Sequence, residues 1–234
     1  MKKVFKRFEC KYLITKSEAK ELEKLVSENI PRDEYPNCTI QSLYYDTPTY
    51  QLIRNSIEKP FYKEKIRIRT YKIPNKDNEV FVELKKKVNK IVYKRRIIMK
   101  YQEAIDYFNN ETLLEGQIGK EINYFKSFYK NLQPSFLIIY DRNAYCDSEK
   151  DLRITFDFNI RFRTDNLSLS NEPSGELILD EDKVLMEIKT CMGYPKWLCD
   201  YLSGHQIYKT SFSKYGTAYK KLILGGKQWI YLKQ

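Results

Sequence analysis

Several features that define common protein classes are missing from this sequence. No stretch approaches the ~18–20 consecutive apolar residues of a membrane-spanning helix, and the basic N-terminus has no apolar run long enough for a signal peptide. The 5 cysteines form no CxxC pair and follow no regular spacing, which argues against a zinc site and against a disulfide framework. These absences predict a soluble, cytoplasmic protein in a reducing compartment.

Motifs for familiar catalytic and nucleic-acid-binding chemistry are also missing. His205 is the only histidine, so the chain has no Ser-His-Asp set, and no cysteine carries a reactive-thiol signature. No helix-turn-helix, zinc-finger or RRM-type aromatic motif occurs, which makes nucleic acid the weaker kind of polyanionic partner.

What the sequence has in excess is positive charge. It holds 42 Lys and Arg against 31 Asp and Glu in 234 residues, a formal net charge of +11. This balance favours polyanionic partners such as nucleic acid, an anionic membrane or phosphorylated small molecules. The alternative is compositional, because a chain rich in Lys, Ile, Asn and Tyr carries extra lysine whatever its function. The placement of the charges has to decide between the two.

The hydrophobic pattern predicts an α+β fold. Hydrophobic residues make up 42% of the chain, and no repeat or linker divides it, so we expect one domain over 1–234. We predict strands at 7–14, 39–47, 63–71, 79–87, 90–98, 136–146, 152–163 and 183–190, and helices at 17–29 (capped by Ser17), 48–58, 101–109, 119–131, after Pro195 and at 213–224. Short connections favour antiparallel pairing, and so large a sheet tends to close into a barrel or split into a sandwich. The polar segment 164–182 is either a loop or a short hairpin.

Most predicted strands carry charge on one face and apolar side chains on the other. In YKEKIRIRTYK, the face opposite the two isoleucines carries Lys63, Lys65, Arg67 and Arg69. For one strand, a solvated outer face explains the pattern. Across many strands this explanation weakens, because helices are available to cover the apolar faces. Inside a closed barrel, the packed cations would need a flexible polyanion to neutralise them, and Arg and Lys both suit phosphate oxygens.

The charged motifs occur in an order that resembles a known family. The pieces are RFECKY, SLYYDT, KIRIRTY, VELKKK, YKRR, YDRNAY, LRITFD, MEIK and FSKY, and they span essentially the whole chain. They resemble the triphosphate tunnel metalloenzymes and, within that group, the VTC domain, which is the polyphosphate polymerase domain of the vacuolar transporter chaperone complex. The resemblance implies an antiparallel eight-stranded β-barrel, the triphosphate tunnel, with helices packed on the outside and a basic lining that binds triphosphate and polyphosphate.

The resemblance also implies roles for the residues that match the family's motifs. Eight catalytic cations are expected to grip the phosphates: Lys11, Arg67, Arg69, Lys85, Lys94, Arg142, Arg153 and Lys214. Four further residues are expected to contact the substrate: Tyr140, Ser213, Lys189 and Arg96. Glu187 is expected to hold Mn²⁺ or Mg²⁺, which oxygen ligands suit. Lys63 and Lys65 are expected nearer the mouth of the tunnel, as guides or as surface charge.

Two departures from the family's patterns limit what the resemblance implies. The adenylate cyclase and thiamine triphosphatase branch opens with an ExExK motif, and here Arg7 replaces its first glutamate. The missing carboxylate argues against that branch's acid-rich metal site and favours the VTC-like branch. The eukaryotic polymerase chains also carry membrane-spanning and inositol-phosphate-sensing regions that these residues lack, so the sequence gives no ground for inferring transport of polymer across a membrane.

Three functions are compatible with this pattern. The leading one is a metal-dependent polyphosphate polymerase that transfers the γ-phosphate of ATP to a growing chain and releases ADP, by positioning and charge neutralisation. The second uses the same site with water as the acceptor, which gives a tripolyphosphatase or nucleoside triphosphatase. The third is a non-catalytic module that binds polyphosphate or, less well supported, nucleic acid.

Overall fold

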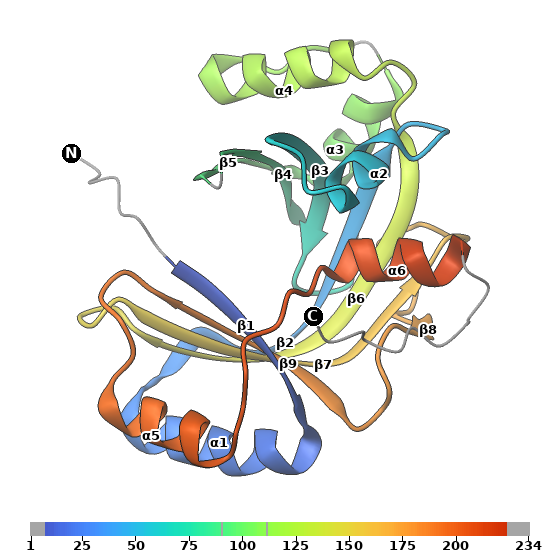
Figure 1. The fold of residues 1–234 in the computed structure, drawn as a ribbon. Helices are drawn as coiled ribbons and strands as arrows, with labels where there is room; N and C mark the ends of the chain where they lie inside the picture. The colour runs from blue at the N-terminus through green and yellow to red at the C-terminus, as the bar shows by residue number, and fades with distance from the viewer. Residues whose placement is uncertain (1–7, 90, 111, 224–234) are drawn as a thin grey trace. The chain divides into compact units, whose positions relative to one another are not determined.

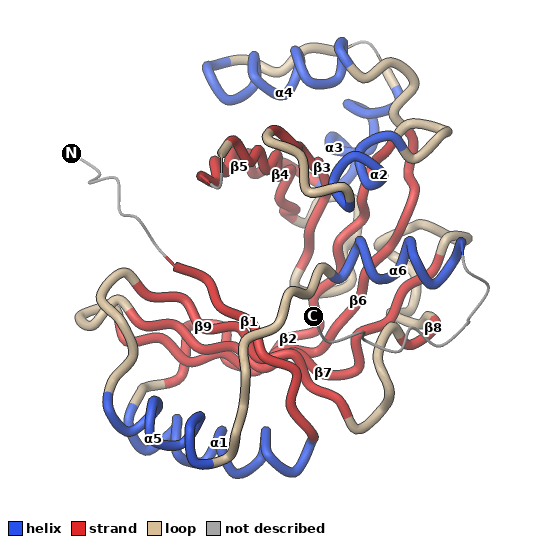
Figure 2. The backbone as a smooth tube through the Cα atoms, in the orientation of Figure 1, coloured by secondary structure: helices blue, strands red, loops and turns tan. Residues whose placement is uncertain are grey.

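The computed structural model describes residues 8–89, 91–110 and 112–223, which form nine strands and six helices (Figures 1 and 2). The strands are β1 (Phe8–Thr15), β2 (Arg32–Asp46), β3 (Tyr62–Thr70), β4 (Glu79–Val88), β5 (Ile91–Lys100), β6 (Gln133–Asp147), β7 (Leu152–Arg163), β8 (Glu176–Leu177) and β9 (Lys183–Thr190). The helices are α1 (Lys16–Asn29), α2 (Gln51–Ile57), α3 (Tyr101–Asn109), α4 (Gly116–Phe128), α5 (Lys196–Gly204) and α6 (Lys214–Ile223). No helix in these ranges is long and apolar enough to cross a membrane.

The observed elements follow the predicted ones closely, with differences mainly at their ends. β2 begins at Arg32 rather than at residue 39, because its first residues around Pro36 are mostly exposed and lack the apolar alternation on which the prediction depends. The polar segment 164–182 contains the two-residue strand β8, which pairs with β7.

The start of α1 shows how local chemistry sets one boundary. Thr15, rather than the predicted Ser17, is the N-cap: its hydroxyl oxygen accepts a hydrogen bond from the N–H of Glu18 at 3.2 Å. In return, the Glu18 carboxylate accepts from the N–H of Thr15 at 2.7 Å. This capping box satisfies two backbone donors that the helix leaves without partners, so the helix begins directly at the end of β1.

The strands form an antiparallel sheet whose hydrogen-bonded order is β1-β9-β7-β6-β2-β3-β4-β5, with β8 paired to β7. The predicted α+β class and the antiparallel pairing are therefore confirmed. The predicted closure into a barrel is not found, because the order of strands in the described residues ends at β1 on one side and at β5 on the other. Closure depends on pairing between the first and last strands of this order, which the alternation within each strand does not specify.

The chain forms two compact units, each assembled from three stretches of sequence. Among the described residues, the first unit comprises 8–39, 140–160 and 179–212, and the second comprises 40–139 apart from 90 and 111, 161–178 and 213–223. Three strands, β2, β6 and β7, contribute residues to both units. The assignment of 1–234 to a single domain stays a prediction.

In the first unit, helices cover one face of the sheet. α1 and α5 pack on the same side of β1, β7 and β9 (Figure 1). The buried strand residues are spaced two apart, as side-chain alternation requires. They include Tyr12, Ile14, Ile154, Phe156, Met186 and Ile188, which pack against Leu22, Val26 and Leu198 of the helices. Burial on this side leaves the odd-numbered residues of these three strands on the opposite face.

The second unit has the same two-sided arrangement, with α3 and α4 covering β2, β3 and β4 (Figure 1). Its core includes Leu43, Tyr45, Ile66, Ile68, Val82 and Leu84 from the strands and Ala104, Tyr107, Ile122 and Phe125 from the helices. Each large side chain removed from water here contributes about 1.5–3 kcal/mol to folding. The register of β3 is therefore strongly specified, and its four odd-numbered cations share the face turned away from α3 and α4.

Candidate functional site

The charged side of the first unit, which we call the first face, is formed by β1, β9, β7 and β6. In the register of β1, β9 and β7, one row across the strands is Glu9, Lys189 and Arg153, and the next is Lys11, Glu187 and Thr155. Arg142 of β6 reaches the same face, because it contacts Glu187. Acids and cations therefore alternate along β1 and β9 and pair across these two strands, which stabilises the arrangement, whereas Lys189 also lies opposite Arg153 of β7.

Glu187 lies at the centre of the first face. Its carboxylate is 3.5 Å from the Lys11 ammonium, 3.6 Å from the Lys189 ammonium and 3.6 Å from the Arg142 guanidinium. The same two lysines also approach Glu9, at 3.5 Å and 3.9 Å. Three cations therefore surround one carboxylate whose side chain is only 8% exposed.

Arg142 and Arg153 are both held by partners of their own. The guanidinium of Arg142 donates to both carboxylate oxygens of Asp157, from Nε at 2.6 Å and from Nη2 at 2.7 Å. Burial by itself would lower the pKa of Arg142, but Asp157 outweighs that effect and raises the pKa well above its ordinary value. Arg153 donates from Nε to Asp33 at 2.7 Å. These bidentate and single ion pairs hold the two guanidinium groups in fixed orientations.

The charged side of the second unit, which we call the second face, is built from β2, β3, β4 and β5. The register aligns its residues in four rows across the strands: Lys63 and Lys87; Lys65, Lys85 and Lys94; Tyr44, Arg67, Glu83 and Arg96; and Ser42, Arg69 and Phe81. The first two rows hold five lysines, and the other two hold three arginines. Like charges that lie directly opposite one another on a sheet are destabilising, so this face favours an anion.

Glu83 is the acid at the centre of the three arginines. It accepts from Nε of Arg67 at 2.8 Å and from Nε of Arg96 at 2.8 Å, and it lies 3.8 Å from Nε of Arg69. Burial alone would raise the pKa of Glu83, but Arg67, Arg69 and Arg96 together lower it to about 2. Arg67 also donates to the Tyr44 hydroxyl at 2.8 Å, and Arg69 donates to Ser42 at 3.2 Å. The arginine rows are therefore ordered by hydrogen bonds before any ligand binds.

The start of α6 meets the second face at Lys65. The Lys65 ammonium donates to the hydroxyl of Ser213 at 3.3 Å. Ser213 in turn caps α6, because its hydroxyl oxygen accepts from the N–H of Gly216 at 3.2 Å. Lys214 is the first residue of this helix. A helix N-terminus beside lysines provides the N–H groups and the positive potential that phosphate oxygens require.

The lysine rows differ from the arginine rows in how their charges are held. Lys63 donates to the carbonyl oxygen of Ser56, near the C-terminus of α2, at 2.9 Å. Burial lowers the pKa of Lys63, and the nearby Lys87 and Lys59 lower it further. Lys86, between Lys85 and Lys87, faces the opposite side of the sheet and lies 3.6 Å from Glu64. The ammonium groups of Lys87 and Lys59 therefore repel that of Lys63, and a bound anion would relieve this repulsion.

Comparison with protein families identifies the kind of fold that carries these faces. The family profile described as VTC domain matches residues 6–223. The chain belongs to the VTC domain family. A search of curated proteins gave no match for this VTC domain protein. Family membership supports a function related to triphosphate or polyphosphate, and it makes a phosphoryl-related enzyme that depends on a divalent metal the general expectation.

Solved structures that resemble this VTC domain include two bacterial proteins. A Bacillus halodurans protein described as a candidate adenylate cyclase aligns with a TM-score of 0.56 and 14% identity, covering 88% of this chain and 92% of that one. A Vibrio parahaemolyticus protein with the same description aligns with a TM-score of 0.48 and 10% identity, covering 93% of this chain and 99% of that one. At 14% identity, the first of these likenesses supports a shared fold and nothing about activity.

The sequence-predicted site residues of the VTC domain lie on the first face, on the second face and at the start of α6. The first face contains Lys11, Tyr140, Arg142, Arg153, Glu187 and Lys189. The second face contains Arg67, Arg69, Lys85, Lys94 and Arg96, with Ser213 and Lys214 at the start of α6. The catalytic, substrate-binding and metal-binding roles assigned to these residues remain predictions.

Sequence reasoning missed the partners that order these cations. The sequence pattern assigns no role to Glu83, which pairs with Arg67, or to Asp157, which pairs with Arg142. Tyr44, whose hydroxyl accepts from Arg67, was not considered. Glu83 lies two residues before Lys85, and therefore on the same face of β4. Together with the pairing of β3 and β4, this spacing is the signal that could have indicated its contact with Arg67.

A metal at Glu187 fits the first face only if the substrate supplies further ligands. No group of three or more His, Cys, Asp or Glu side chains suited to a metal occurs in the described ranges. The oxygen donors nearby are Glu187, Glu9 and the Thr155 hydroxyl, which is buried, lies opposite Glu187 in the register and has no hydrogen-bond partner in the described structure. Mg²⁺ commonly binds one or two carboxylates together with substrate phosphates and water, and this donor set suits that mode.

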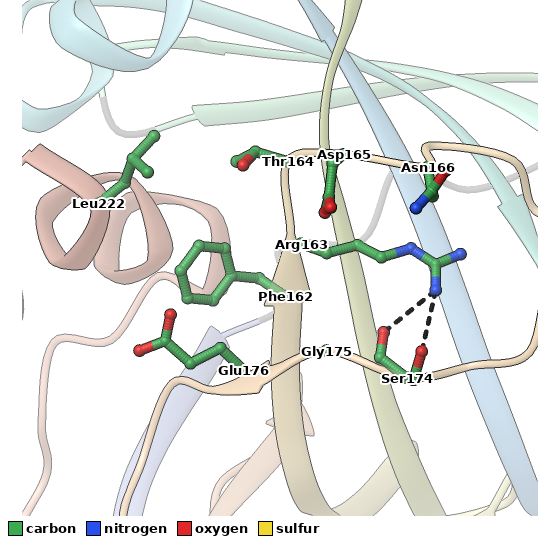
Figure 3. Close-up of a pocket in the computed structure, with 9 residues that line it drawn as sticks. All are labelled: Phe162, Arg163, Thr164, Asp165, Asn166, Ser174, Gly175, Glu176 and Leu222. Carbon is green, nitrogen blue, oxygen red and sulfur yellow. Dashed lines mark hydrogen bonds between the residues drawn. The ribbon is translucent and has the colours of Figure 1, made fainter.

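A cavity of about 350 Å³ lies elsewhere in the second unit, beside β8 (Figure 3). Arg163 lines it, but its guanidinium donates to Ser174 at 3.2 Å and to the carbonyl oxygens of Ser168 and Glu172 at 3.2 Å and 2.9 Å. Gly175 passes so close to β7 that a Cβ would lie 2.5 Å from the carbonyl oxygen of Phe162. Arg163 therefore holds the loop before β8 in place, and none of the predicted site residues lines this cavity.

Proposed function

We propose that the protein is a metal-dependent polyphosphate polymerase. A terminal oxygen of the polyphosphate chain attacks the γ-phosphorus of ATP, and the bond from the γ-phosphorus to the β–γ bridging oxygen breaks. The electron pair leaves with ADP, and the chain gains one phosphate. The acceptor oxygen is already anionic, so the reaction requires no general base, and charge neutralisation and positioning provide the catalysis.

The observation that carries this proposal is the composition of the second face. It has eight cations in four registered rows, and Glu83 is the one acid that the register places among them. Binding a flexible polyanion there replaces repulsion between lysines with attraction to phosphate. A single phosphate monoester would reach only a few of these cations, whereas a chain of phosphates offers anionic groups along all four rows and is the ligand that fits best.

The arginines and the lysines of the second face suggest two different roles in phosphate binding. Arg67 and Arg69 are already oriented by Glu83, Tyr44 and Ser42, so we assign the reacting phosphates to them. Planar guanidinium groups suit a phosphoryl group whose geometry changes during transfer. The lysine rows provide point charges on flexible stems, and we assign the remainder of the chain to them.

The first face supplies the metal in this proposal. Glu187, together with Glu9 and Thr155, would hold Mn²⁺ or Mg²⁺, and the ion would supply Lewis-acid polarisation to phosphate oxygens bound at this face. Lys11 and Lys189 contact both carboxylates and would bind the phosphates that share the ion. We propose a cytoplasmic location, where ATP is available and the five free thiols of this chain stay reduced.

The test is incubation of the purified protein with ATP and Mn²⁺, followed by separation of the products on a gel. We expect polyphosphate chains and ADP in a ratio of one added phosphate per ADP. Orthophosphate and ADP without polymer would show that water is the acceptor and would replace the polymerase with a triphosphatase. Binding of polyphosphate without any turnover of ATP would leave only a binding module.

Two variants connect this reaction to the second face. Arg67→Ala removes a cation of the arginine rows, whereas Arg95→Ala removes an arginine from the opposite side of β5, where it pairs with Glu121. We expect polymer formation to be lost in the first variant and kept in the second. Equal activities in the two variants would contradict the assignment of the reaction to this face.

A further inference from the structure

Tyr215, in the first turn of α6, is a buried residue that touches several parts of the second face without belonging to its rows of cations. Its side chain is 2% exposed. Its ring stacks on Tyr44 with 4.5 Å between ring centres, and the Lys65 ammonium lies 5.5 Å from the centre of the same ring. Tyr44 in turn accepts the hydrogen bond from Arg67. The ring of Tyr215 therefore packs against Tyr44, which binds Arg67, and it also lies beside the Lys65 ammonium.

The hydroxyl of Tyr215 fixes α6 to a buried carboxylate. It donates to Oδ2 of Asp46 at 2.8 Å, and Asp46 is fully buried. Burial and the neighbouring Asp46 carboxylate raise the pKa of Tyr215, so the tyrosine keeps its proton and is the donor. Asp46 also accepts from the N–H groups of Leu52 and Ile53, at 2.9 Å and 3.0 Å, in the first turn of α2. The carboxylate therefore joins the end of β2 to α2 and α6.

The start of α6 is close-packed at the point where it reaches the site. A Cβ at Gly216 would lie 3.2 Å from the hydroxyl oxygen of Ser213, so glycine lets the cap approach the helix. That same hydroxyl accepts the hydrogen bond from Lys65. A displacement of α6 would therefore move Ser213 and Lys214 together, and it would change the contact with Lys65.

A helix as short as α6 needs tertiary contacts to keep a defined position, because isolated helices below about 12–15 residues are marginal in water. α6 has 10 residues. Its Tyr215–Asp46 hydrogen bond is buried, and a buried hydrogen bond to a charged group is among the stronger contacts available. This bond is therefore well suited to determine where the helix begins.

We infer that Tyr215 and Asp46 are positioning residues for phosphate binding, whose hydrogen bond sets where α6 presents Ser213 and Lys214 to the second face. The inference rests on the proposed function, because it concerns the same phosphate-binding face. It adds that the contribution of Lys214 depends on a tyrosine hydroxyl that does not itself touch the ligand. Neither residue is a catalytic group, since both act through Ser213, Lys214 and Tyr44.

The test compares two tyrosines that differ in location but share their chemistry. Tyr215→Phe removes only the hydroxyl that binds Asp46. Tyr107→Phe is the matched control, because Tyr107 is also 2% exposed and its hydroxyl donates to Asn123 at 2.9 Å, on the side of the sheet covered by α3 and α4. Thermal unfolding and calorimetric binding of tripolyphosphate are measured for both. We expect similar losses of stability, but a roughly tenfold weaker binding only for Tyr215→Phe.

A double-mutant cycle with Lys214→Ala separates positioning from a general loss of stability. If Tyr215 acts through Lys214, Tyr215→Phe has little further effect on binding once Lys214 is alanine. Additive losses would overturn the inference. Asp46→Asn provides an independent variant that keeps the shape of the side chain and removes its charge, and we expect it to weaken tripolyphosphate binding as Tyr215→Phe does.

The outcomes for the inference and for the proposed function are distinct. Wild-type protein that binds neither tripolyphosphate nor longer chains would remove the proposed function itself. Wild-type protein that binds tripolyphosphate, with equal affinities in Tyr215→Phe and Tyr107→Phe, would overturn the positioning role and leave the proposed function intact.

Discussion

The two charged faces share one motif and differ in their balance of charge. On the first face Lys11, Lys189 and Arg142 surround Glu187, and on the second face three arginines surround Glu83. In both units, a single carboxylate therefore keeps three cations in place. In this position the carboxylate acts as a weak internal anion that neutralises part of the positive charge. A phosphate group carries more charge and more oxygens, so it competes with the carboxylate for the same cations.

Beyond that motif the faces diverge. The cations of the first face have Glu9, Glu187, Asp157 and Asp33 as partners, so cations and acids are equal in number there. The second face adds two rows of lysines to its arginines without adding an acid in the register. In the proposed function, the first face would hold the metal and the second would hold the chain of phosphates. Because the strands of both faces alternate charged and apolar residues, the sequence pattern alone does not distinguish the two faces.

The largest expected effect is on the stability of the first unit. Arg142→Met leaves the Asp157 carboxylate buried without its partner, and we expect a loss of about 3–5 kcal/mol in the free energy of unfolding. Urea denaturation measures it. The double variant Arg142→Met with Asp157→Leu should recover most of the loss, because both charges of the buried pair are then removed. A loss of phosphate affinity without a loss of stability would contradict this prediction. It would mean that Arg142 binds phosphate, as we propose for the arginines of the second face.

The next effect concerns how the stability of the second unit depends on pH. Because the folded pKa of Glu83 is lowered to about 2, its contribution is present above the ordinary glutamate pKa and is lost as the pH falls from about 5 to 2. Glu83→Gln should lose stability on the order of 3 kcal/mol at pH 7. The difference from wild type should shrink at pH 3. Glu79→Gln, at the exposed start of β4, is the control, and an unchanged pH profile in Glu83→Gln would contradict the prediction.

A smaller effect is expected on ligand affinity at the arginine rows. Arg67→Ala should weaken tripolyphosphate binding roughly 10- to 100-fold, because it removes charge-assisted hydrogen bonds to phosphate. Isothermal titration measures the dissociation constant. Arg95→Ala, from the opposite side of the same sheet, should bind as wild type does. Equal weakening in both variants would mean that overall charge, and not the second face, determines affinity.

The smallest effect is expected at the lysine rows and should depend on chain length. Lys87→Ser should weaken binding of long polyphosphate roughly two- to fivefold, as expected for one partly solvated charge, and should leave tripolyphosphate binding unchanged. Lys86→Ser is the neighbouring control, because Lys86 faces the other side of the sheet. Loss of affinity for both ligands to the same extent would mean that Lys87 binds the same phosphates as the arginines. The separate roles that we propose for lysines and arginines would then be wrong.

The parts of this structure that depend on local alternation could be predicted from the sequence. Lys65, Arg67 and Arg69 share a face because side chains in a strand alternate, and the isoleucines between them are buried as that pattern requires. α1, α3 and α6 follow from apolar spacing in the same way. The separation of charged from apolar faces in both units is therefore a property of short segments.

What could not be predicted depends on which strands lie side by side. Glu83 gathers three arginines only because β3 and β5 flank β4 in one particular register. Arg142 and Asp157 are 15 positions apart and meet through the fold. The same limit explains why closure into a barrel was expected but not found, since no pattern within a strand determines the ends of the sheet.

The strict alternation of β3 has a consequence for how this protein can evolve. A single-residue insertion between Lys63 and Arg69 would turn the cations beyond it toward α3 and α4 and expose the isoleucines, because side chains repeat every two residues. Substitutions at one position change one contact, whereas a change of length by one residue exchanges the two faces at once. Lineages that keep the site are therefore expected to vary this strand in residue type, and to lengthen or shorten it mainly in its loops or in steps of two.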